Sequence, residues 1–271
     1  MTKTVLVTGS SSGIGRAIAT CFADKTWHVA ATMRRPENDT ALAARPSVKL
    51  YRLDVTDPAS IDAAISSAIA DFGGIDVVVN NAGFSLDGVF EAMDDDALRR
   101  EFETNVFGLM RVTRAIIPYF RQRRGGTIVQ IASMGGRITL PLYAPYHASK
   151  WAVEGFSESL QFELRPLGIK LRIVEPGAVK TDFYGRSRAF VRPADTDAYD
   201  NFIRKVEAVN LRAGASGRPP AEVAAMVYKA AIDRGDRLRY VVGAPAPLLL
   251  TLRRLLPDRL WLAVVRRSYG I

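Results

Sequence analysis

Short β-branched hydrophobic runs alternate with longer amphipathic segments over the first 180 residues of the chain. A strand buried on both faces has a continuous apolar run, whereas a helix that covers a sheet repeats apolar residues at positions i, i+3 and i+4. The alternation predicts βαβ units around a parallel sheet. The expected strands lie near 5–8, 28–33, 48–53, 76–80, 127–133, 170–175 and 239–242. The expected helices span about 13–23, 60–72, 95–124 with a break near Glu103 or Thr104, 146–164, 219–233 and 248–269.

The domain organisation follows from the continuity of this pattern. The sequence contains no internal repeat, low-complexity tract or linker rich in Pro and Ser. We therefore predict a single α/β domain with a Rossmann-type doubly wound parallel sheet over residues 1–245, and a basic, amphipathic helical extension of the same domain over 246–271. The pattern loosens after Pro176, and the stretch 181–218 mixes five aromatic residues with many polar ones. A connection of this length is either disordered or a lid over a substrate site.

The charge balance widens the range of partners to consider. The 271 residues include 37 Lys and Arg against 28 Asp and Glu, a net charge of +9, which is compatible with nucleic acid, an anionic membrane or an acidic small molecule. The single cysteine, Cys21, cannot form an internal disulfide, which excludes a disulfide-held scaffold. A strand-like segment begins at Thr4 without a signal-peptide pattern before it. We therefore expect a cytoplasmic protein.

A turn rich in Gly and Ser follows the first predicted strand and begins the first predicted helix. Its spacing is Gly-x3-Gly-x-Gly. The exposed N–H groups and the dipole of a helix N-terminus favour a pyrophosphate, and glycines let it approach the backbone closely. We predict a dinucleotide phosphate site, with a simple strand-to-helix turn as the alternative. The expected contacts are Gly9, Ser11, Ser12, Gly13, Ile14 and Gly15.

The end of the second predicted strand bears on the choice of dinucleotide. An acidic residue there accepts hydrogen bonds from the ribose of NAD, whereas the extra phosphate of NADP requires positive charge. The strand ends in Arg34 and Arg35, and a guanidinium fits a phosphate with paired hydrogen bonds. The sequence favours NADP(H). NAD(H) stays open, because Glu37 or Asp39 could fold back to the ribose.

Two side chains with acid–base chemistry lie one helical turn apart. Tyr146 and Lys150 are four residues apart in a predicted helix, so they share one face. A nearby ammonium stabilises a phenolate and lowers the pKa of a phenol toward the neutral range. Ser133 ends a predicted strand, at the edge where open α/β sheets bind ligands. This combination is typical of proton transfer to or from a substrate oxygen.

Six motifs between about residues 3 and 182 converge on one family. They are the turn 8–15, Asn80-Asn81-Ala82-Gly83 after a strand, Asn105 in Asn-Val-Phe-Gly, Ser133 thirteen residues before Tyr146, Tyr-x-Ala-Ser-Lys at 146–150, and Pro176-Gly177 followed by Thr181. Together they resemble the short-chain dehydrogenase/reductase family. The resemblance implies an oxidoreductase that moves a hydride between a nicotinamide and a ketone, an aldehyde or a secondary alcohol.

The resemblance also implies roles for individual residues. Tyr146 would be the general acid or base, Lys150 would lower its pKa and bind the nicotinamide ribose, Ser133 would hydrogen-bond the substrate oxygen, and Asn105 would hold a water of a proton relay. No metal is required. Further cofactor contacts implied by the resemblance are Asp54, Val55, Asn81, Ala82, Gly83, Pro176, Gly177, Val179 and Thr181. Alternatively, Asp54 caps the following turn, and Asn80 or Asn81 ties neighbouring strands together. His147 is interpreted as structural.

The substrate and the partners are less well defined by the sequence. The region after 181 resembles the subgroup of 17β-hydroxysteroid and retinol dehydrogenases, which implies a lipophilic ketone or alcohol. The family resemblance implies a homodimer or homotetramer packed through the helices that contain Asn105 and Tyr146. A non-catalytic dinucleotide sensor or a DNA-associated regulator is the alternative, although no helix-turn-helix or zinc pattern would organise nucleic-acid binding.

The C-terminal segment concentrates the positive charge. Residues 234–271 contain eight arginines against two aspartates, a net charge of +6 out of +9. Leu256, Leu260 and Val264 repeat every four residues with Trp261 and Val265 beside them, and Arg259 and Arg266 fall on the other side, which is compatible with a helix in a membrane interface. The favoured interpretation is a tail docked on its own domain or on an oligomer partner, because amphipathic helices usually face a core.

Overall fold

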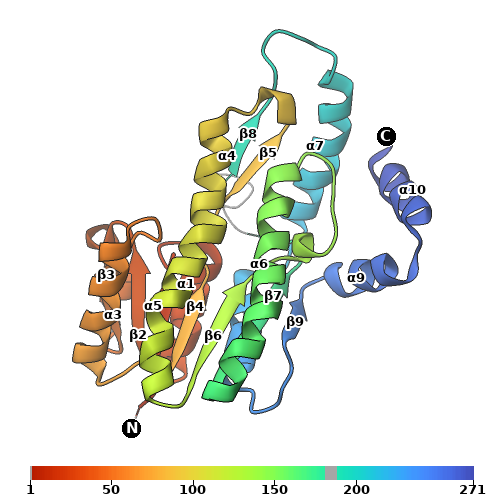
Figure 1. Ribbon diagram of the computed structural model, residues 1–271. Helices are drawn as coiled ribbons and strands as arrows, with labels where there is room; N and C mark the ends of the chain where they lie inside the picture. The colour runs from red at the N-terminus through yellow and green to blue at the C-terminus, as the bar shows by residue number, and fades with distance from the viewer. Residues whose placement is uncertain (1, 181–187) are drawn as a thin grey trace.

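A computed structural model describes residues 2–180 and 188–271 (Figure 1). Its main sheet has seven parallel strands in the order β3-β2-β1-β4-β6-β7-β9. This architecture confirms the predicted Rossmann-type fold. The strand order reverses between β1 and β4, and such a reversal creates a crevice at the carboxyl ends of the strands. The strands are β1 (Thr4–Thr8), β2 (His28–Met33), β3 (Val48–Arg52), β4 (Val77–Asn80), β6 (Gly126–Ile131), β7 (Ile169–Pro176) and β9 (Arg239–Val242).

Helices cover both faces of the main sheet, as Figure 1 shows. On one face lie α1 (Gly13–Asp24) and α8 (Pro220–Ile232), and on the other α3 (Pro58–Phe72), α5 (Leu109–Gln122) and α6 (Ala144–Leu164). The residues of strand β1 pack against the helices on both faces of the sheet. Val5 and Val7 are buried against α1 and α8, while Leu6 between them is buried on the opposite side. This alternation explains the continuous apolar runs of the strands.

The long helical segment after residue 95 is not broken as expected. Helix α4 (Asp95–Phe102) continues through a π-helical segment, η3 (Glu103–Gly108), directly into α5. The wider turn lies at the predicted position but keeps the helix continuous. Gly108 at its end is in close contact with Val55, because a Cβ on this glycine would lie 2.6 Å from Val55 Cγ2. Residues 103–108 therefore pack tightly over the sheet edge.

A small second sheet forms above the main one. Strand β5 (Ser85–Gly88) pairs in parallel with β8 (Arg188–Val191), and α7 (Asp200–Ala215) follows. Arg188 joins the three elements, since its guanidinium lies 2.6 Å from Asp87 on β5 and 2.5 Å from Glu207 on α7. The stretch 188–215, expected to be a disordered connection or a lid, thus forms a strand and a helix. Thr181, Phe183 and Tyr184 lie outside the described residues.

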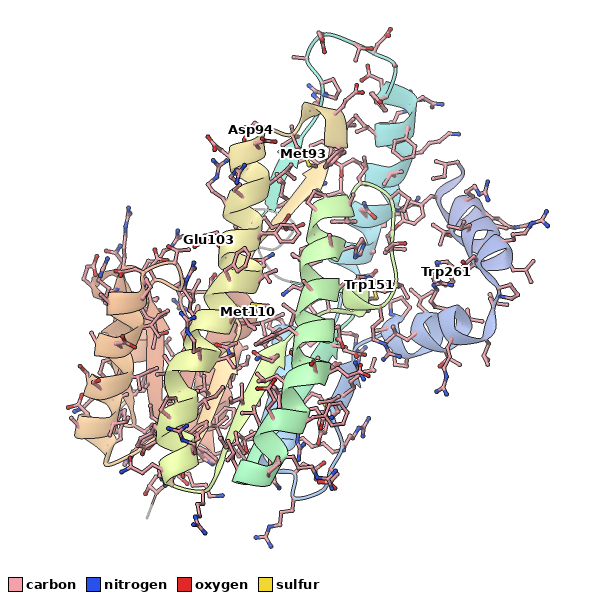
Figure 2. The ribbon with its side chains drawn as sticks, in the orientation of Figure 1. Met93, Asp94, Glu103, Met110, Trp151 and Trp261 are labelled. Carbon is pink, nitrogen blue, oxygen red and sulfur yellow. The ribbon has the colours of Figure 1, made fainter. Side chains whose placement is uncertain are left out.

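The C-terminal extension consists of two helices rather than one. Helix α9 (Ala246–Leu255) ends before Pro257, and α10 (Asp258–Tyr269) begins after it. Both stand at one side of the molecule in Figure 1. The buried face of α10 carries Trp261, labelled in Figure 2, with Val265 and Tyr269. Leu260 and Val264 are exposed instead, so the four-residue repeat did not identify the docking face. The domain boundary at residue 245 stays a prediction.

The remaining short elements connect these parts. They are η1 (Pro36–Asn38), α2 (Thr40–Ala43), η2 (Phe90–Ala92), η4 (Met134–Gly136) and η5 (Arg165–Leu167). Among the described residues, no helix is both long enough and apolar enough to cross a bilayer.

Candidate active site

Four parallel strands bring the predicted site segments to one edge of the main sheet. Strands β1, β4, β6 and β7 end at Thr8, Asn80, Ile131 and Pro176. The carboxyl ends of parallel strands meet at the same edge. The glycine-rich turn, the Asn81 segment, Ser133 and Gly177 therefore all begin at this carboxyl rim.

The turn between β1 and α1 has the shape that a bound phosphate requires. Gly9 and Gly13 have positive φ values of 69° and 53°. A Cβ at Gly15 would lie 2.2 Å from the Gly9 carbonyl oxygen and 2.5 Å from Asn81 Nδ2. The first N–H groups of a helix lack intrahelical acceptors, and Ser12 makes no capping hydrogen bond with its side chain. These donors, together with the crowded glycines, fit a pyrophosphate at the start of α1.

Asn81 connects this turn to the end of β4. Its side-chain amide donates to the carbonyl oxygens of Thr8 (3.0 Å) and Gly9 (3.2 Å), and its backbone N–H donates to the Thr8 hydroxyl. Ala82 N also donates to the Thr8 hydroxyl. Asn80 has a different role, because its amide donates to Gln130 and Thr113 in the interior. Both asparagines therefore tie strands together, as the alternative interpretation proposed.

The charged side chains after β2 differ in their exposure and in whether other residues already bind them. Arg34 and Arg35 are exposed directly beyond the strand. Asp39 is buried, lies 2.6 Å from Arg16, and accepts a hydrogen bond from Leu42 N as the cap of α2. The Asp39 carboxylate is thus occupied by these two partners, whereas Glu37 is exposed near the arginines. The two arginines are exposed and can receive a phosphate.

Asp54 and Val55 follow β3. The Asp54 carboxylate accepts hydrogen bonds from the backbone and the hydroxyl of Thr56, at 2.9 and 2.7 Å. Asp54 therefore caps the turn into α3, as the alternative interpretation held. Val55 is buried against Gly108. Their contact with an adenine stays a prediction.

The acid–base pair lies at the start of α6. Lys150 is buried, and its Nζ donates to the carbonyl oxygen of Ile131 (3.0 Å), the last residue of β6. The same Nζ lies 5.8 Å from the centroid of the Tyr146 ring. Ser133 is two residues beyond Ile131 and accepts a hydrogen bond from Gly135 N at 3.0 Å. The helix and the strand end thus bring Tyr146, Lys150 and the Ser133 segment together.

His147 holds the backbone that follows Ser133. Its Nδ1 lies 2.8 Å from the Gly135 carbonyl oxygen, and its Nε2 accepts a hydrogen bond from Leu140 N at 3.1 Å. A neutral ring with the proton on Nδ1 satisfies both contacts. Burial lowers the pKa of His147 to about 4 and keeps the ring neutral. The geometry agrees with the structural role predicted for this residue.

Asn105 is buried within the π-helical segment. Its Oδ1 accepts a hydrogen bond from Phe84 N (3.0 Å), and its Nδ2 donates to Phe84 O (2.8 Å) and to the Ser149 hydroxyl (3.2 Å). A Cβ at Gly83 would lie 2.9 Å from Asn105 Oδ1. The Asn105 amide thus joins the segment after β4 to helix α6, one residue before Lys150. Its role in a proton relay stays a prediction.

A buried carboxyl group that the sequence did not single out lies beside Asn105. Glu101 Oε1 accepts hydrogen bonds from Leu86 N (3.1 Å) and Asn105 Nδ2 (3.4 Å). Desolvation raises the pKa of Glu101 to about 7, although the charge of Lys150 opposes this shift. The sequence contains one signal that could have identified Glu101: it lies four residues before Asn105 in the same predicted helix, so the two side chains share a face. Ser149, which also contacts Asn105, lies inside the Tyr-x-Ala-Ser-Lys motif.

Burial also changes the acidity of Lys150. Desolvation lowers the pKa of the ammonium to about 8, while the carboxylates of Glu101 and Glu154 act in the opposite direction. Because a pKa near 8 is close to neutral, this amine can gain or lose a proton at small cost. Such a group suits a proton relay.

The segment after β7 completes the rim. Gly177 N donates to Val242 O at 2.8 Å, and a Cβ at Gly177 would lie 2.8 Å from the Gly243 carbonyl oxygen. Val179 is buried and pairs with Arg218 in an isolated bridge. Pro176, Gly177 and Val179 therefore follow the same carboxyl edge as the other predicted contacts. Thr181 falls outside the described residues.

The fold and this arrangement of side chains define a nucleotide-binding oxidoreductase of the short-chain dehydrogenase type. The model of the short chain dehydrogenase family matches residues 3–191. The chain belongs to the short-chain dehydrogenase/reductase family, which confirms the predicted family and reaction class.

Similar proteins extend the match over nearly the whole chain. An uncharacterized oxidoreductase of Bacillus subtilis, YusZ, is 36% identical and is covered over 98% of both chains. A 3-ketodihydrosphingosine reductase of Bacteroides thetaiotaomicron is 31% identical over 98% of both chains. An NADPH-dependent 3-dehydrocapnine reductase of Ornithobacterium rhinotracheale is 31% identical over 94% of this chain and 93% of the relative.

Solved structures give the same result. A short-chain dehydrogenase from Streptomyces avermitilis superposes with a TM-score of 0.82, at 36% identity over 98% of both chains. A structure of ElxO with NADP bound has a TM-score of 0.72, 25% identity and coverage of 89% of this chain and 98% of the other. A short-chain dehydrogenase/reductase from Burkholderia phymatum in complex with NAD has a TM-score of 0.79, 26% identity and coverage of 97% and 95%.

Proposed function

We propose that the protein reduces a lipophilic ketone, or oxidises the corresponding alcohol, with NADP(H). The observation that carries this proposal is the Tyr146–Lys150 pair on α6, anchored to the end of β6 by the hydrogen bond from Lys150 Nζ to Ile131 O. A phenol beside a buried amine at the carboxyl rim has the chemistry of a general acid and base.

Separate residues of the chain would bind the substrate oxygen and transfer its proton. The Tyr146 hydroxyl would protonate this oxygen during reduction and remove the proton during oxidation. Ser133 would hold the oxygen by a hydrogen bond, and Lys150 would stabilise the phenolate and return the proton toward Asn105. A bound nicotinamide supplies or accepts the hydride. The side chains therefore have to orient the substrate and move one proton.

Exposed positive charge supports NADP(H) as the cofactor. Arg34 and Arg35 are exposed beyond β2, whereas the Asp39 carboxylate is held by Arg16 and by the cap of α2. The relatives include an NADPH-dependent reductase and a structure with NADP bound, while a structure with NAD keeps that cofactor open.

An apolar region next to Ser133 supports a lipophilic substrate. Met134 packs in a hydrophobic cluster with Leu140, Phe190, Tyr199 and Phe202, among others from α7, α9 and α10. Three of the five aromatics between 181 and 218 are thus partly buried beside the rim. Two relatives are named for 3-keto derivatives of long-chain amines, 3-ketodihydrosphingosine and 3-dehydrocapnine. We favour a long-chain ketone over a steroid or retinoid.

Assembly and location belong to the same proposal. Two large side chains, Phe107 and Trp151, are half exposed on η3 and α6, and Figure 2 shows Trp151 on the face that also carries Met110 of α5. This face supports a homodimer or homotetramer formed through these helices. The cytoplasmic location expected from the sequence stays a prediction.

Replacing the phenol tests the catalytic assignment. Tyr146→Phe removes only the hydroxyl, so NADPH binding, measured by fluorescence titration, is expected to stay within about twofold of the natural protein. Turnover of a long-chain ketone is expected to fall about 10²–10⁴-fold, as for a lost general acid.

Tyr51→Phe is the matched control. It removes a hydroxyl that contacts Asp71 on the surface, away from the rim, and should leave turnover unchanged. Near-normal turnover of Tyr146→Phe would refute the assigned role. Activity of the natural protein on small polar ketones but not on long-chain ketones would refute the substrate class alone.

The cofactor assignment is tested at the end of β2. Charge-assisted hydrogen bonds are worth about 1.5–3 kcal/mol, so Arg34→Ala with Arg35→Ala should weaken NADPH binding about 10–100-fold and change NADH binding little. The double change Arg99→Ala with Arg100→Ala on α4 is the control, because it removes two exposed arginines elsewhere. Tighter binding of NADH than NADPH to the natural protein would overturn the assignment.

A further inference from the structure

The two C-terminal helices have one face that docks on the protein and another that does not. Leu250, Trp261, Val265 and Tyr269 are buried in a cluster with residues of α7. The Tyr269 hydroxyl donates to Asn210 Oδ1 at 2.9 Å, and Lys205 Nζ donates to Gly270 O at 2.7 Å. These contacts fix the helices on α7, so their remaining faces have a defined orientation toward solvent.

The opposite side of α9 is apolar. Leu248, Leu252 and Leu255 follow each other at i, i+4 and i+7 and share one helix face. Leu248 and Leu255 are 62% and 72% exposed, whereas Leu250 on the other side is 7% exposed. A helix with apolar residues on both sides has one partner in its own domain and requires a second for the exposed side.

Helix α10 continues this exposed apolar surface beyond Pro257. Leu260 and Val264, four residues apart on one helix face, are 55% and 41% exposed. Leu255 and Leu260 flank the bend between the two helices. We define the outer tail face by four exposed residues, Leu248 and Leu255 of α9 and Leu260 and Val264 of α10.

Arginines surround the outer tail face. Residues 246–271 contain five arginines and one aspartate, a net charge of +4. Arg254, Arg259, Arg266 and Arg267 are exposed, and the aspartate, Asp258, already lies 2.8 Å from Arg253. The segment therefore offers exposed positive charge beside exposed leucines.

This charge selects among the partners that an apolar face could have. A second copy of the chain would place +4 against +4, with the one acidic side chain already paired, and like charges across an interface are repulsive. Nucleic acid would not cover the leucines. An anionic lipid surface satisfies both features, because leucines enter the boundary between headgroups and acyl chains while arginines meet the lipid phosphates.

We propose that the outer tail face binds reversibly to the surface of an anionic membrane. The docked face would stay packed on α7, and no helix would need to span the bilayer. Because the same cluster includes Met134 next to Ser133, a membrane under α9 and α10 would lie close to the apolar side of the catalytic rim. The binding itself does not depend on the identity of the substrate.

Vesicle sedimentation with the full-length protein tests this proposal. The probes are vesicles of phosphatidylcholine alone and of phosphatidylcholine with about one third phosphatidylglycerol. Binding is expected only with phosphatidylglycerol and should decrease steeply between 0.1 and 1 M salt, where the screening length falls from about 10 to 3 Å.

Double substitutions separate the contribution of the leucines to vesicle binding from that of the arginines. Leu255→Ser with Leu260→Ser should weaken binding at least tenfold. Arg259→Gln with Arg266→Gln should weaken it about 20-fold, since each arginine near an anionic surface contributes a factor of about five. Phe162→Ser with Ile232→Ser, on α6 and α8, and Arg99→Gln with Arg100→Gln, on α4, are exposed controls that should bind as the natural protein does.

Three results would overturn the proposal. The natural protein could stay in the supernatant with anionic vesicles, or the tail variants could bind as well as the controls. Alternatively, Leu255→Ser with Leu260→Ser could dissociate an oligomer in sedimentation velocity without changing vesicle binding, which would assign the face to a second copy. NADPH binding by every variant, measured in parallel, shows that each one is folded.

Discussion

Burial brings the pKa values of Lys150, in the proposed acid–base pair, and of two carboxyl groups near it close to neutral. It lowers the pKa of Lys150 to about 8 and raises those of Glu101 and Glu154 to about 7. Opposite charges normally separate such values, but here desolvation outweighs their mutual attraction. These three groups therefore have pKa values within about one unit of neutral, and the charge of Lys150 depends on those of Glu101 and Glu154.

The effect of burial on the pKa of Glu101 can be measured from the pH dependence of the free energy of unfolding. Its pKa in the folded protein is about 7, above the ordinary value of 4.5, so the folded state binds more protons between these values. Stability contributed by the neutral carboxyl group is complete below about pH 4.5 and is lost as the pH rises to about 7. Glu101→Gln has no ionisable group here and does not lose this stability. The difference in free energy of unfolding between the variant and the natural protein should therefore shift in favour of the variant by roughly 2 kcal/mol from pH 5 to pH 8.

Urea unfolding at a series of pH values provides the measurement. Glu163→Gln is the control, because it makes the same substitution at an exposed position of α6. A Glu101→Gln curve parallel to that of the natural protein would show that this carboxyl group is not destabilised by burial.

At some residues one sequence pattern is compatible both with a cofactor contact and with a hydrogen bond that holds the backbone. Asn81 and Asp54 occur in motifs that resemble cofactor contacts, yet their side chains hold the glycine-rich turn and the turn before α3. Such hydrogen bonds between side chain and backbone cannot be distinguished in sequence from groups kept free for a ligand. The structure agrees with the interpretation of His147 as structural, because both of its ring nitrogens contact backbone atoms.

At the scale of elements, buried ion pairs join β9 to its neighbours. Arg239 Nε lies 2.9 Å from Glu154 on α6 and 3.3 Å from Glu175 on β7. The Glu175 side chain is fully buried and also meets Arg137 at 3.1 Å. These contacts hold the edge strand against the centre of the sheet.

Arg239→Met should therefore destabilise the protein by about 3 kcal/mol, because it removes the ion-pair partner of the buried Glu154 and one of the two arginines that contact the buried Glu175. Arg165→Met is the matched control. Its partner Asp236 is exposed, as is Arg165 itself, and exposed pairs contribute less than about 1 kcal/mol. Denaturant unfolding at pH 7.5 measures both. Equal losses for the two variants would contradict the importance of the buried network.

Elements with strong local signals were predicted well. The ranges of β2 and β9 are as expected, and α1, α3 and α6 differ at their ends by one or two residues. The small sheet was missed, because β5 reads Ser-Leu-Asp-Gly, residues with little β propensity apart from the leucine. It forms through the contact of Asp87 with Arg188, which no local pattern contains. On α10, Trp261 and Val265 beside the predicted repeat are buried, whereas Leu260 and Val264 of the repeat are exposed. The partner of this helix, α7, was not predicted.

At the scale of the whole molecule, family and reaction class could be predicted from the order and spacing of motifs. A parallel sheet collects the ends of its strands at one edge, so the linear order of the motifs determines which ones meet. The substrate could not be predicted in this way. The apolar region that we propose for the substrate is built from α7, α9, α10 and the small sheet, and its cluster with Met134 comes from contacts between distant segments.

The pairing of β5 with β8 has a consequence for how the chain acquires its shape. Asp87 and Arg188 are 101 positions apart, and the chain between them contributes β6, β7 and three helices to the rest of the molecule. Closing so long a loop costs considerable entropy unless the intervening chain has already condensed. We therefore expect the small sheet to form after the nucleotide-binding half. By the same reasoning, its amide hydrogens should exchange with solvent before those of the main sheet.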